Sequence, residues 1–165
     1  MKKTTTIILA LLLVSVIPLM PGIGASDETV TGTFTATGTL DVDVNESAPA
    51  FGSIAAGDSA TVELKVTNNG DVTADVTQTQ ASHDSGNLSI GTAGGLGSDE
   101  YGVETWSDGG TSSWQDVSGG TAVIADALTP TSEQNYTMRV SVSSTLTVTS
   151  DENTFSADTS VAADT

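Results

Sequence analysis

The segment Ser59–Thr79, SATVELKVTNNGDVTADVTQT, constrains the fold more than any other part of the chain. Apolar and polar residues alternate in its first half, and a two-residue period places the apolar side chains on one face of a β-strand. The alternation resumes after the turn residues Asn68-Asn69-Gly70-Asp71. Because Asn and Gly accept the positive φ angles of tight turns, the pattern predicts a hairpin of two antiparallel strands with one buried face. The apolar positions are Ala60, Val62, Leu64, Val66, Val72, Ala74 and Val76.

Residues 1–25 have the layout of a secretory signal peptide. Lys2 and Lys3 precede the apolar run Ile7–Met20, and small residues follow it, so we predict cleavage after Ala25 or Ser26. An uncleaved anchor is the alternative, although the run is shorter than the ~20 residues that span a bilayer. The mature protein is therefore expected to be secreted, in the extracellular space or at the cell surface, without contact with the membrane.

Acidic side chains dominate the chain, with 21 Asp and Glu against 4 Lys and Arg and a net charge of −17. Loss of Lys2 and Lys3 with the signal peptide would leave Lys65 and Arg139, and a net charge of −19. Nucleic acid and anionic lipid require a basic surface, which excludes both as partners. An acidic surface suits high-salt solvent, divalent cations or solubility alone. The chain has no Cys, so no disulfide is expected.

The alternation of Thr29–Val44 is unusually long. At ~3.3 Å per residue it would extend roughly 50 Å, against ~17–20 Å for an ordinary strand. It must bend, split into two strands or reach beyond its own domain. We therefore assign residues 26–39 to an extended N-terminal strand, residues 40–150 to a β-domain and residues 151–165 to a polar C-terminal tail, whose end is a candidate for disorder.

The remaining sequence contains further strand signals. Gln80–Gly102 has the composition of a loop, the residues that flank Ser107-Asp108-Gly109-Gly110 predict a hairpin, and Tyr136–Val142 alternates. Leu128, Pro130 and Tyr136 resemble a late corner of Ig-like domains that a Tyr ties down. With about seven to nine strands and no helical periodicity after the signal peptide, we predict an all-β fold, a single Ig-like or jelly-roll antiparallel β-sandwich with an extended N-terminal strand.

Residues that could carry catalysis are sparse. The single histidine, His83, stands among loop residues and is expected on the surface, and the chain has no HExxH motif. Gly91–Gly97 lacks the strand-to-helix setting and the basic residue of a phosphate-binding loop. We therefore expect no enzymatic activity and no cofactor.

Asp41, Asp43 and Asn45 share one face of a predicted strand and begin like an EF-hand calcium loop. The match then fails, because Glu46 stands where Gly is needed and Gly52 where the bidentate Glu belongs. A weak surface Ca²⁺ site and a solvated acidic face are the two interpretations.

Three asparagines, Asn45, Asn87 and Asn135, begin N-glycosylation sequons. These sites are used only if the protein is exported by a host that glycosylates, as many archaea do. Tyr101, Trp106 and Trp114 would form a stacking platform for carbohydrate if exposed, and core or turn packing is the alternative.

A signal peptide, a Thr/Gly-rich segment leading into Ala36–Val44 (ATGTLDVDV) and the central strand pair resemble the TasA/camelysin-type biofilm fibre proteins and the related archaeal bundling pilins. The resemblance covers Ser26–Thr79. It implies a jelly-roll or Ig-like subunit that polymerises when its N-terminal segment enters the sheet of a neighbour. Camelysin-like members have been described as metallopeptidases, an activity that one histidine without HExxH does not support.

The expected function is that of a secreted structural subunit of an extracellular filament or pilus, a head-to-tail homopolymer assembled by donor-strand exchange. The donor residues would be Val30, Gly32, Phe34 and Ala36, with Phe34 as the anchor. In the alternative, this segment folds back as an edge strand of its own domain. Two other functions stay open: a monomeric cell-surface adhesion or carbohydrate-binding module, and an acidic spacer domain of an S-layer or cell envelope.

Overall fold

A computed structural model describes residues 38–46, 48–148 and 152–164, all within one compact unit, Ala36–Thr165. These residues form an all-β structure. None of them lies in a helix that is long and apolar enough to cross a membrane. The expected signal peptide and the donor residues Val30, Gly32, Phe34 and Ala36 lie outside the described residues.

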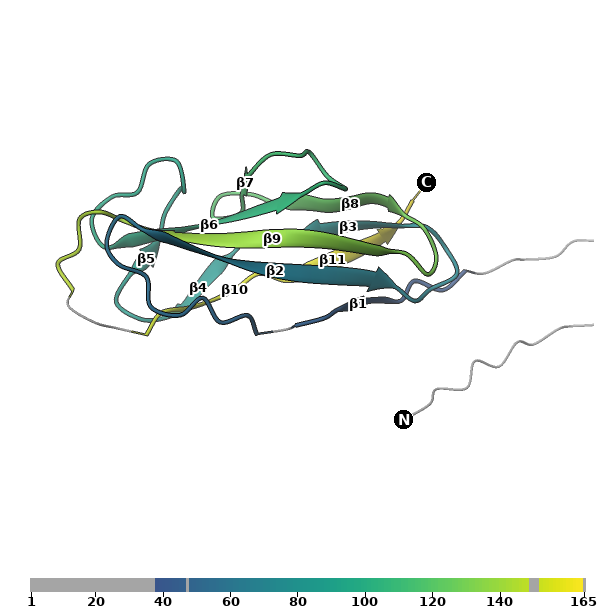
Figure 1. The fold of residues 1–165 in the computed structure, drawn as a ribbon, viewed down its shortest axis with the longest axis horizontal. Coiled ribbons are helices and arrows are strands. Elements are labelled where there is room, and N and C mark those ends of the chain that lie inside the picture. Colours follow the sequence, from purple (N-terminus) through teal and green to yellow (C-terminus); the bar gives the residue numbers. More distant parts are fainter. Residues whose placement is uncertain (1–37, 47, 149–151, 165) are drawn as a thin grey trace, which may run out of the picture. The chain divides into compact units, whose positions relative to one another are not determined.

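Three sheets make up the structure (Figure 1). The largest has the order β1-β2-β9-β6-β5, with β7 also paired to β6, the second has the order β11-β3-β8, and the third joins β10 to β4. All strand pairs are antiparallel except β5 with β6. The strands are β1 (Val42–Val44), β2 (Ser59–Asn68), β3 (Ala74–Gln78), β4 (Ser82–Ser85), β5 (Ser89–Ile90), β6 (Glu100–Ser107), β7 (Gln115–Asp116), β8 (Ala122–Leu128), β9 (Glu133–Val142), β10 (Thr154–Ser156) and β11 (Thr159–Ala163).

The alternation of the central segment is confirmed on both of its strands. Leu64 and Val66 on β2 are buried while Thr61 is exposed, and Ala74 and Val76 on β3 are buried. The predicted hairpin, however, is wrong. β2 pairs with β1 and β9, whereas β3 pairs with β8 and β11 in a different sheet.

Asn68 gives the physical reason for this crossing between sheets. Its side chain is fully buried, and its Nδ2 donates to the carbonyl oxygens of Val72 at 2.9 Å and Leu128 at 2.8 Å. Its Oδ1 accepts from the Gly70 amide at 2.9 Å. The residue expected in a solvent-exposed turn is instead a buried tie that turns the chain from one sheet to the other, since buried polar groups must be hydrogen-bonded.

The C-terminal residues are not a polar tail. β10 and β11 pair with β4 and β3 respectively, so the assignment of 151–165 to a tail is wrong for both strands. The break between the two pairings is bridged by the Thr79 amide, which donates to the Asp158 carbonyl at 2.8 Å, and by the Asp158 amide, which donates to Thr79 Oγ1 at 2.8 Å. β3–β4 and β10–β11 therefore form one bent two-stranded ribbon. The loop expected over Gln80–Gly102 likewise contains β4 and β5.

The core lies between the largest sheet and the sheet of β3, β8 and β11, which Figure 1 shows behind it. Leu64, Val103 and Met138 from the first sheet meet Val76 and Ile124 from the second in one buried cluster. Buried hydrogen bonds also join the sheets. Thr105 Oγ1 donates to Gln78 Oε1 at 3.0 Å, and Ser107 Oγ donates to the Ile124 carbonyl.

Two local predictions have different outcomes. The hairpin around Ser107–Gly110 is confirmed, because β7 pairs antiparallel with β6 through Glu104↔Asp116 and Thr105↔Gln115. Tyr136 is buried as an inward residue of β9, but its hydroxyl bonds to the side chain of Thr159 on β11 and not to the preceding corner. The tyrosine thus ties the C-terminal ribbon to the largest sheet.

Candidate functional site: an open groove at one edge

The edge of β2 that faces β1 is paired along only part of its length. β1 covers Val66–Asn68, and the Asn45 amide donates to the Lys65 carbonyl at 3.0 Å. Backbone groups alternate sides along a strand, so those of Glu63 and Thr61 point the same way as those of Lys65. Among the described residues no backbone hydrogen bond is made to this side of Glu63 or Thr61. Within the part of the chain that the structure describes, this side of the first half of β2 is therefore without a backbone partner.

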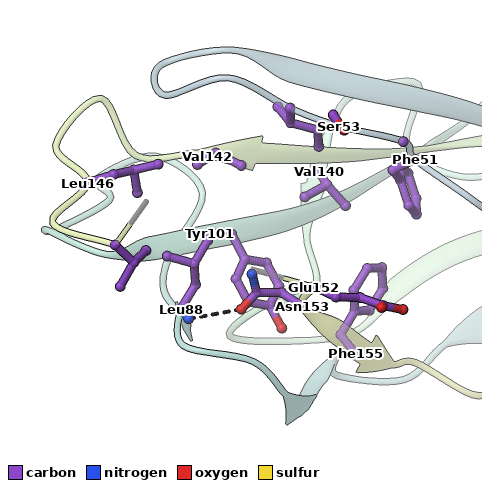
Figure 2. A pocket seen from close by; sticks show the side chains of 13 residues that line it. Phe51, Ser53, Leu88, Tyr101, Val140, Val142, Leu146, Glu152, Asn153 and Phe155 are labelled. Atoms are coloured by element: carbon purple, nitrogen blue, oxygen red, sulfur yellow. Dashed lines mark hydrogen bonds between the residues drawn. The ribbon is translucent and has the colours of Figure 1, made fainter. Parts of the chain in front are cut away.

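Two adjoining cavities, of about 520 and 750 Å³, lie on the inner side of the largest sheet, where Leu64 is the residue of β2 that lines them. Both are lined by Phe51, Gly52, Glu152, Asn153 and Phe155, and together they form one groove, called here the edge groove. Figure 2 shows the smaller cavity, with Val140 and Val142 of β9 on one side and Phe155 of β10 on the other. The groove thus follows the side of the core on which the largest sheet and the C-terminal ribbon are not joined by a strand.

The floor of the edge groove is apolar and has the spacing of a strand. Tyr136, Met138, Val140 and Val142 follow one another at every second position of β9, and Leu64 lies on the neighbouring β2. All five side chains are buried.

Three aromatic rings stand in a row at the middle of the groove. The ring centroid of Phe155 lies 5.9 Å from that of Phe51 and 6.2 Å from that of Tyr101. Such a row offers a deep apolar contact to an inserted side chain.

Tyr101 and His83 are the polar pair at the base of this row. Tyr101 is 3% exposed, and its hydroxyl lies 3.1 Å from His83 Nδ1. Burial, with a smaller contribution from the charge of Asp84, raises the pKa of Tyr101 to about 12. Burial likewise raises the pKa of Tyr136 to about 12. Both phenols therefore stay neutral at ordinary pH, and His83 is half-buried where a surface position was expected.

Asp99 positions one wall of the groove. It has a positive φ of 56°, its carboxylate accepts from the Thr147 hydroxyl, and its Oδ1 accepts from the Thr147 amide at 2.6 Å. These hydrogen bonds, that of the Thr147 side chain first, lower the pKa of Asp99. The flanking residues Leu146 and Val148 line the groove.

The calcium candidates lie on an exposed face, and each of them already accepts a hydrogen bond from another part of the chain. Asp43 Oδ2 accepts from Asn69 Nδ2 at 2.8 Å, and Asn45 Oδ1 accepts from the Lys65 amide at 2.7 Å. The Asp41 carbonyl accepts from the amides of Asn69 and Gly70. No group of three or more His, Cys, Asp or Glu side chains gathers in the described part of the chain. Asp41 and Asp43 serve the turn after β2, and Asn45 bonds the backbone of Lys65 within β2, roles that sequence reasoning missed.

The aromatic residues do not form one platform. Tyr101 is in the core, whereas Trp114 is 37% exposed and Trp106 is half-buried. The Arg139 guanidinium lies 4.1 Å from the centroid of the Trp114 ring, and its Nε donates to Glu104 at 2.8 Å. The contact of Arg139 with Trp114 was not foreseen, because nothing in the sequence reports which residues face each other across strands.

The sequon asparagines Asn45, Asn87 and Asn135 are all exposed. The two basic side chains in the described residues both form ion pairs, Lys65 with Glu133 at 2.7 Å and Arg139 with Glu104. Among the described residues, neither Lys65 nor Arg139 is therefore left unpaired to balance the remaining carboxylates.

Comparison with known proteins assigns no family to the chain. No protein-family model matches it, and no curated protein matches it.

Proposed function

We propose that this protein is a secreted subunit of an extracellular filament, and that residues 26–37 of one copy enter the edge groove of the next. The observation that carries the proposal is a stretch of β2 without a backbone partner among the described residues, next to a groove whose floor is apolar and has the spacing of a strand. We further infer that the two facing sheets form an Ig-like or jelly-roll β-sandwich that lacks a full-length edge strand on this side.

Backbone pairing supplies the first part of the fit. An inserted strand would hydrogen-bond to Thr61 and Glu63 and continue the line that β1 begins at Val66–Asn68. Such β-augmentation obtains its affinity from main-chain hydrogen bonds and its specificity from pockets for alternate side chains. It would also cover an edge that otherwise invites uncontrolled pairing.

Side-chain spacing supplies the second part. Val30, Gly32, Phe34 and Ala36 are small or apolar at every second position, like the row on the floor of the groove. Phe34 is the one large residue among them, and the aromatic row of Phe51, Phe155 and Tyr101 is the matching contact.

The position of Thr39 favours a neighbouring copy over the same chain. The Thr39 carbonyl accepts from the Asp71 amide at 3.1 Å, beyond the C-terminal end of β2, whereas the open edge lies toward the start of β2. The segment before Thr39 would have to reverse and pass β1 to reach its own groove. A neighbour requires no reversal, and unlike donor and acceptor surfaces give a head-to-tail contact that propagates.

Two complementary variants test the proposal on the mature chain. Phe34→Asp disables the donor and leaves the groove intact. Thr61→Pro disables the acceptor, because proline removes an amide that points to the open edge and is tolerated there. Each variant alone should be a folded monomer by circular dichroism and light scattering, while the unaltered chain forms filaments in electron micrographs. Thr61→Ala is the matched control and should still assemble.

A mixture of the two variants is the decisive experiment. Phe34→Asp can accept and Thr61→Pro can donate, so an equimolar mixture should give dimers and no longer species. Filaments from either variant alone, or monomers only from the unaltered chain at every salt and calcium concentration, would contradict the proposal. In the second case, glycan binding would favour an adhesion module, and co-fractionation with the envelope would favour a spacer domain.

A further inference from the structure

Asn135 differs from the other two sequon asparagines in its surroundings. It lies on the outer face of β9, directly opposite Lys65 of β2 and one position beyond Tyr136, where the pairing of β9 with β6 ends. Its side chain is exposed, and its side-chain amide has no hydrogen-bond partner among the described residues. At Asn45, by contrast, Oδ1 already accepts from the Lys65 amide.

The register between β9 and β6 places a tryptophan beside this asparagine. Trp106 is directly opposite Thr137, the third residue of the sequon. Asn135 and Thr137 are two positions apart, so both point outward and Asn135 is the diagonal neighbour of Trp106. Diagonal pairs in an antiparallel sheet lie ~7–8 Å apart, within reach of a large aromatic side chain. The indole of Trp106 is half-buried and partly open to solvent on this face.

We infer that Asn135 carries an N-linked oligosaccharide whose first sugar packs against the Trp106 indole. A pyranose ring presents a face of C–H groups, and an aromatic face is the surface such groups contact most favourably. The inference requires the export included in the proposed function but not filament formation, since the outer face of β9 is on the opposite side of the sheet from the edge groove.

The surrounding residues suit a carbohydrate better than another protein. Beyond Trp106 the same face carries the ion pair of Arg139 with Glu104, and Arg139 is covered by Trp114. Directly opposite Asn135 on β2 is Lys65, which is paired with Glu133. Paired charges with spare hydrogen-bonding capacity around an aromatic surface form an amphipathic strip, and hydroxyl groups can bond along it while a sugar ring contacts the indole.

Peptide mapping of the protein from the cells that make it is the first test. The peptide containing Asn135 should carry a glycan mass that Asn135→Gln abolishes. An unmodified Asn135 in the exported protein overturns the inference, whether or not that protein forms filaments. A glycosylated Asn135 on a chain that stays monomeric would contradict only the proposed function.

A double-mutant cycle tests the packing. If one sugar–indole contact is worth ~1 kcal/mol, Asn135→Gln should lower the melting temperature of the exported protein by roughly 4 °C. In a Trp106→Ser background the same change should lower it by less than about 1 °C. In chains made without glycosylation, Asn135→Gln should not change the melting temperature, whether residue 106 is Trp or Ser. If Asn135→Gln lowers the melting temperature of the exported protein equally with Trp106 and with Trp106→Ser, the sugar does not pack against the indole.

Fluorescence gives a measurement that does not depend on Trp106→Ser folding. In the Trp114→Phe variant, Trp106 is the only tryptophan, since the chain has two. Acrylamide should quench it less in the glycosylated protein than in the Asn135→Gln form. Equal quenching in the two forms overturns the contact between sugar and indole.

Discussion

The two long edges of the core are finished in different ways. At the edge formed by β6, β7 and β8, side chains take the place of a missing strand: Gln115 Nε2 donates to the Val123 carbonyl at 3.1 Å, and its Oε1 accepts from the Val123 amide at 3.0 Å. The Asp126 amide also donates to the Gly109 carbonyl at 3.0 Å. At the edge formed by β2 and β10, Asn45 bonds both backbone groups of Lys65, but in the described residues no such bond reaches Glu63 or Thr61, and the edge groove lies there.

We call the edge formed by β6, β7 and β8 the sealed edge, and the edge formed by β2 and β10 the receptive edge. A sealed edge satisfies its own backbone groups and offers little to another chain. A receptive edge keeps both requirements of strand addition, unpaired backbone groups and an apolar floor, in one place.

A matched pair of isoleucines should show the largest difference. Ile124 is fully buried on β8 near the sealed edge, whereas Ile54 is half-buried in the wall of the edge groove. Ile124→Ala should lower the free energy of unfolding by ~2–5 kcal/mol, and Ile54→Ala by less than ~1 kcal/mol, because the second site is already open. Urea denaturation measures both, and equal losses would show that the groove is closed.

Alkaline titration reports on the floor of the groove. The pKa of both tyrosines is raised from 10 to about 12, so the folded state holds their protons more tightly. This stabilisation is complete below pH 10 and is lost as the pH rises from 10 to 12, by up to ~2–3 kcal/mol for each phenol. Tyr136→Phe should flatten the fall in unfolding free energy between these values. Phenolate absorbance that rises near pH 10 would mean that water reaches the floor.

Two glutamine substitutions test whether the Gln115 side chain closes the edge at Val123. Gln115→Ala leaves both backbone groups of Val123 without their partner and should lower the free energy of unfolding by ~1–2 kcal/mol. Gln134→Ala removes one exposed hydrogen bond, to the Asn135 carbonyl, and should have almost no effect. If Gln115→Ala is also without effect, side-chain bonding does not close that edge.

The smallest effect is expected at Asp99. Its lowered pKa means that ionised Asp99 stabilises the folded state above its ordinary titration range, and that this contribution is lost as the pH falls below about 4. Asp99→Asn should speed hydrogen exchange of the Thr147 amide at pH 6, and the difference should vanish on acidification. Unchanged exchange at pH 6 would show that Asp99 does not hold the wall at Leu146 and Val148.

The sequence predicted where strands form better than it predicted which strands pair with each other. The period of Ser59–Thr79 reports which side chains are buried, and Leu64, Val66, Ala74 and Val76 are buried as predicted. It cannot report which sheet a strand joins, since that depended on the burial of Asn68. β10 and β11 were missed because their alternation is short and consists mainly of Ser, Thr and Ala, apart from Phe155 and Val161.

The candidate site was predictable only in part. The donor half of the proposed contact is a sequence pattern and could be written down from Val30, Gly32, Phe34 and Ala36. The acceptor half could not, because the edge groove draws residues from β2, β9 and β10 and from the segment around Phe51. Phe155 was the one available signal, an aromatic residue in an otherwise polar stretch.

The bent ribbon has a consequence for the order of folding. β4 gains its partner only with residues 154–156, and β3, which also pairs with β8, gains its second partner only with residues 159–163. Pairings of such wide sequence separation raise contact order and slow the folding step. The two sheets that contain β10 and β11 are therefore complete only after residues 159–163 have been synthesised.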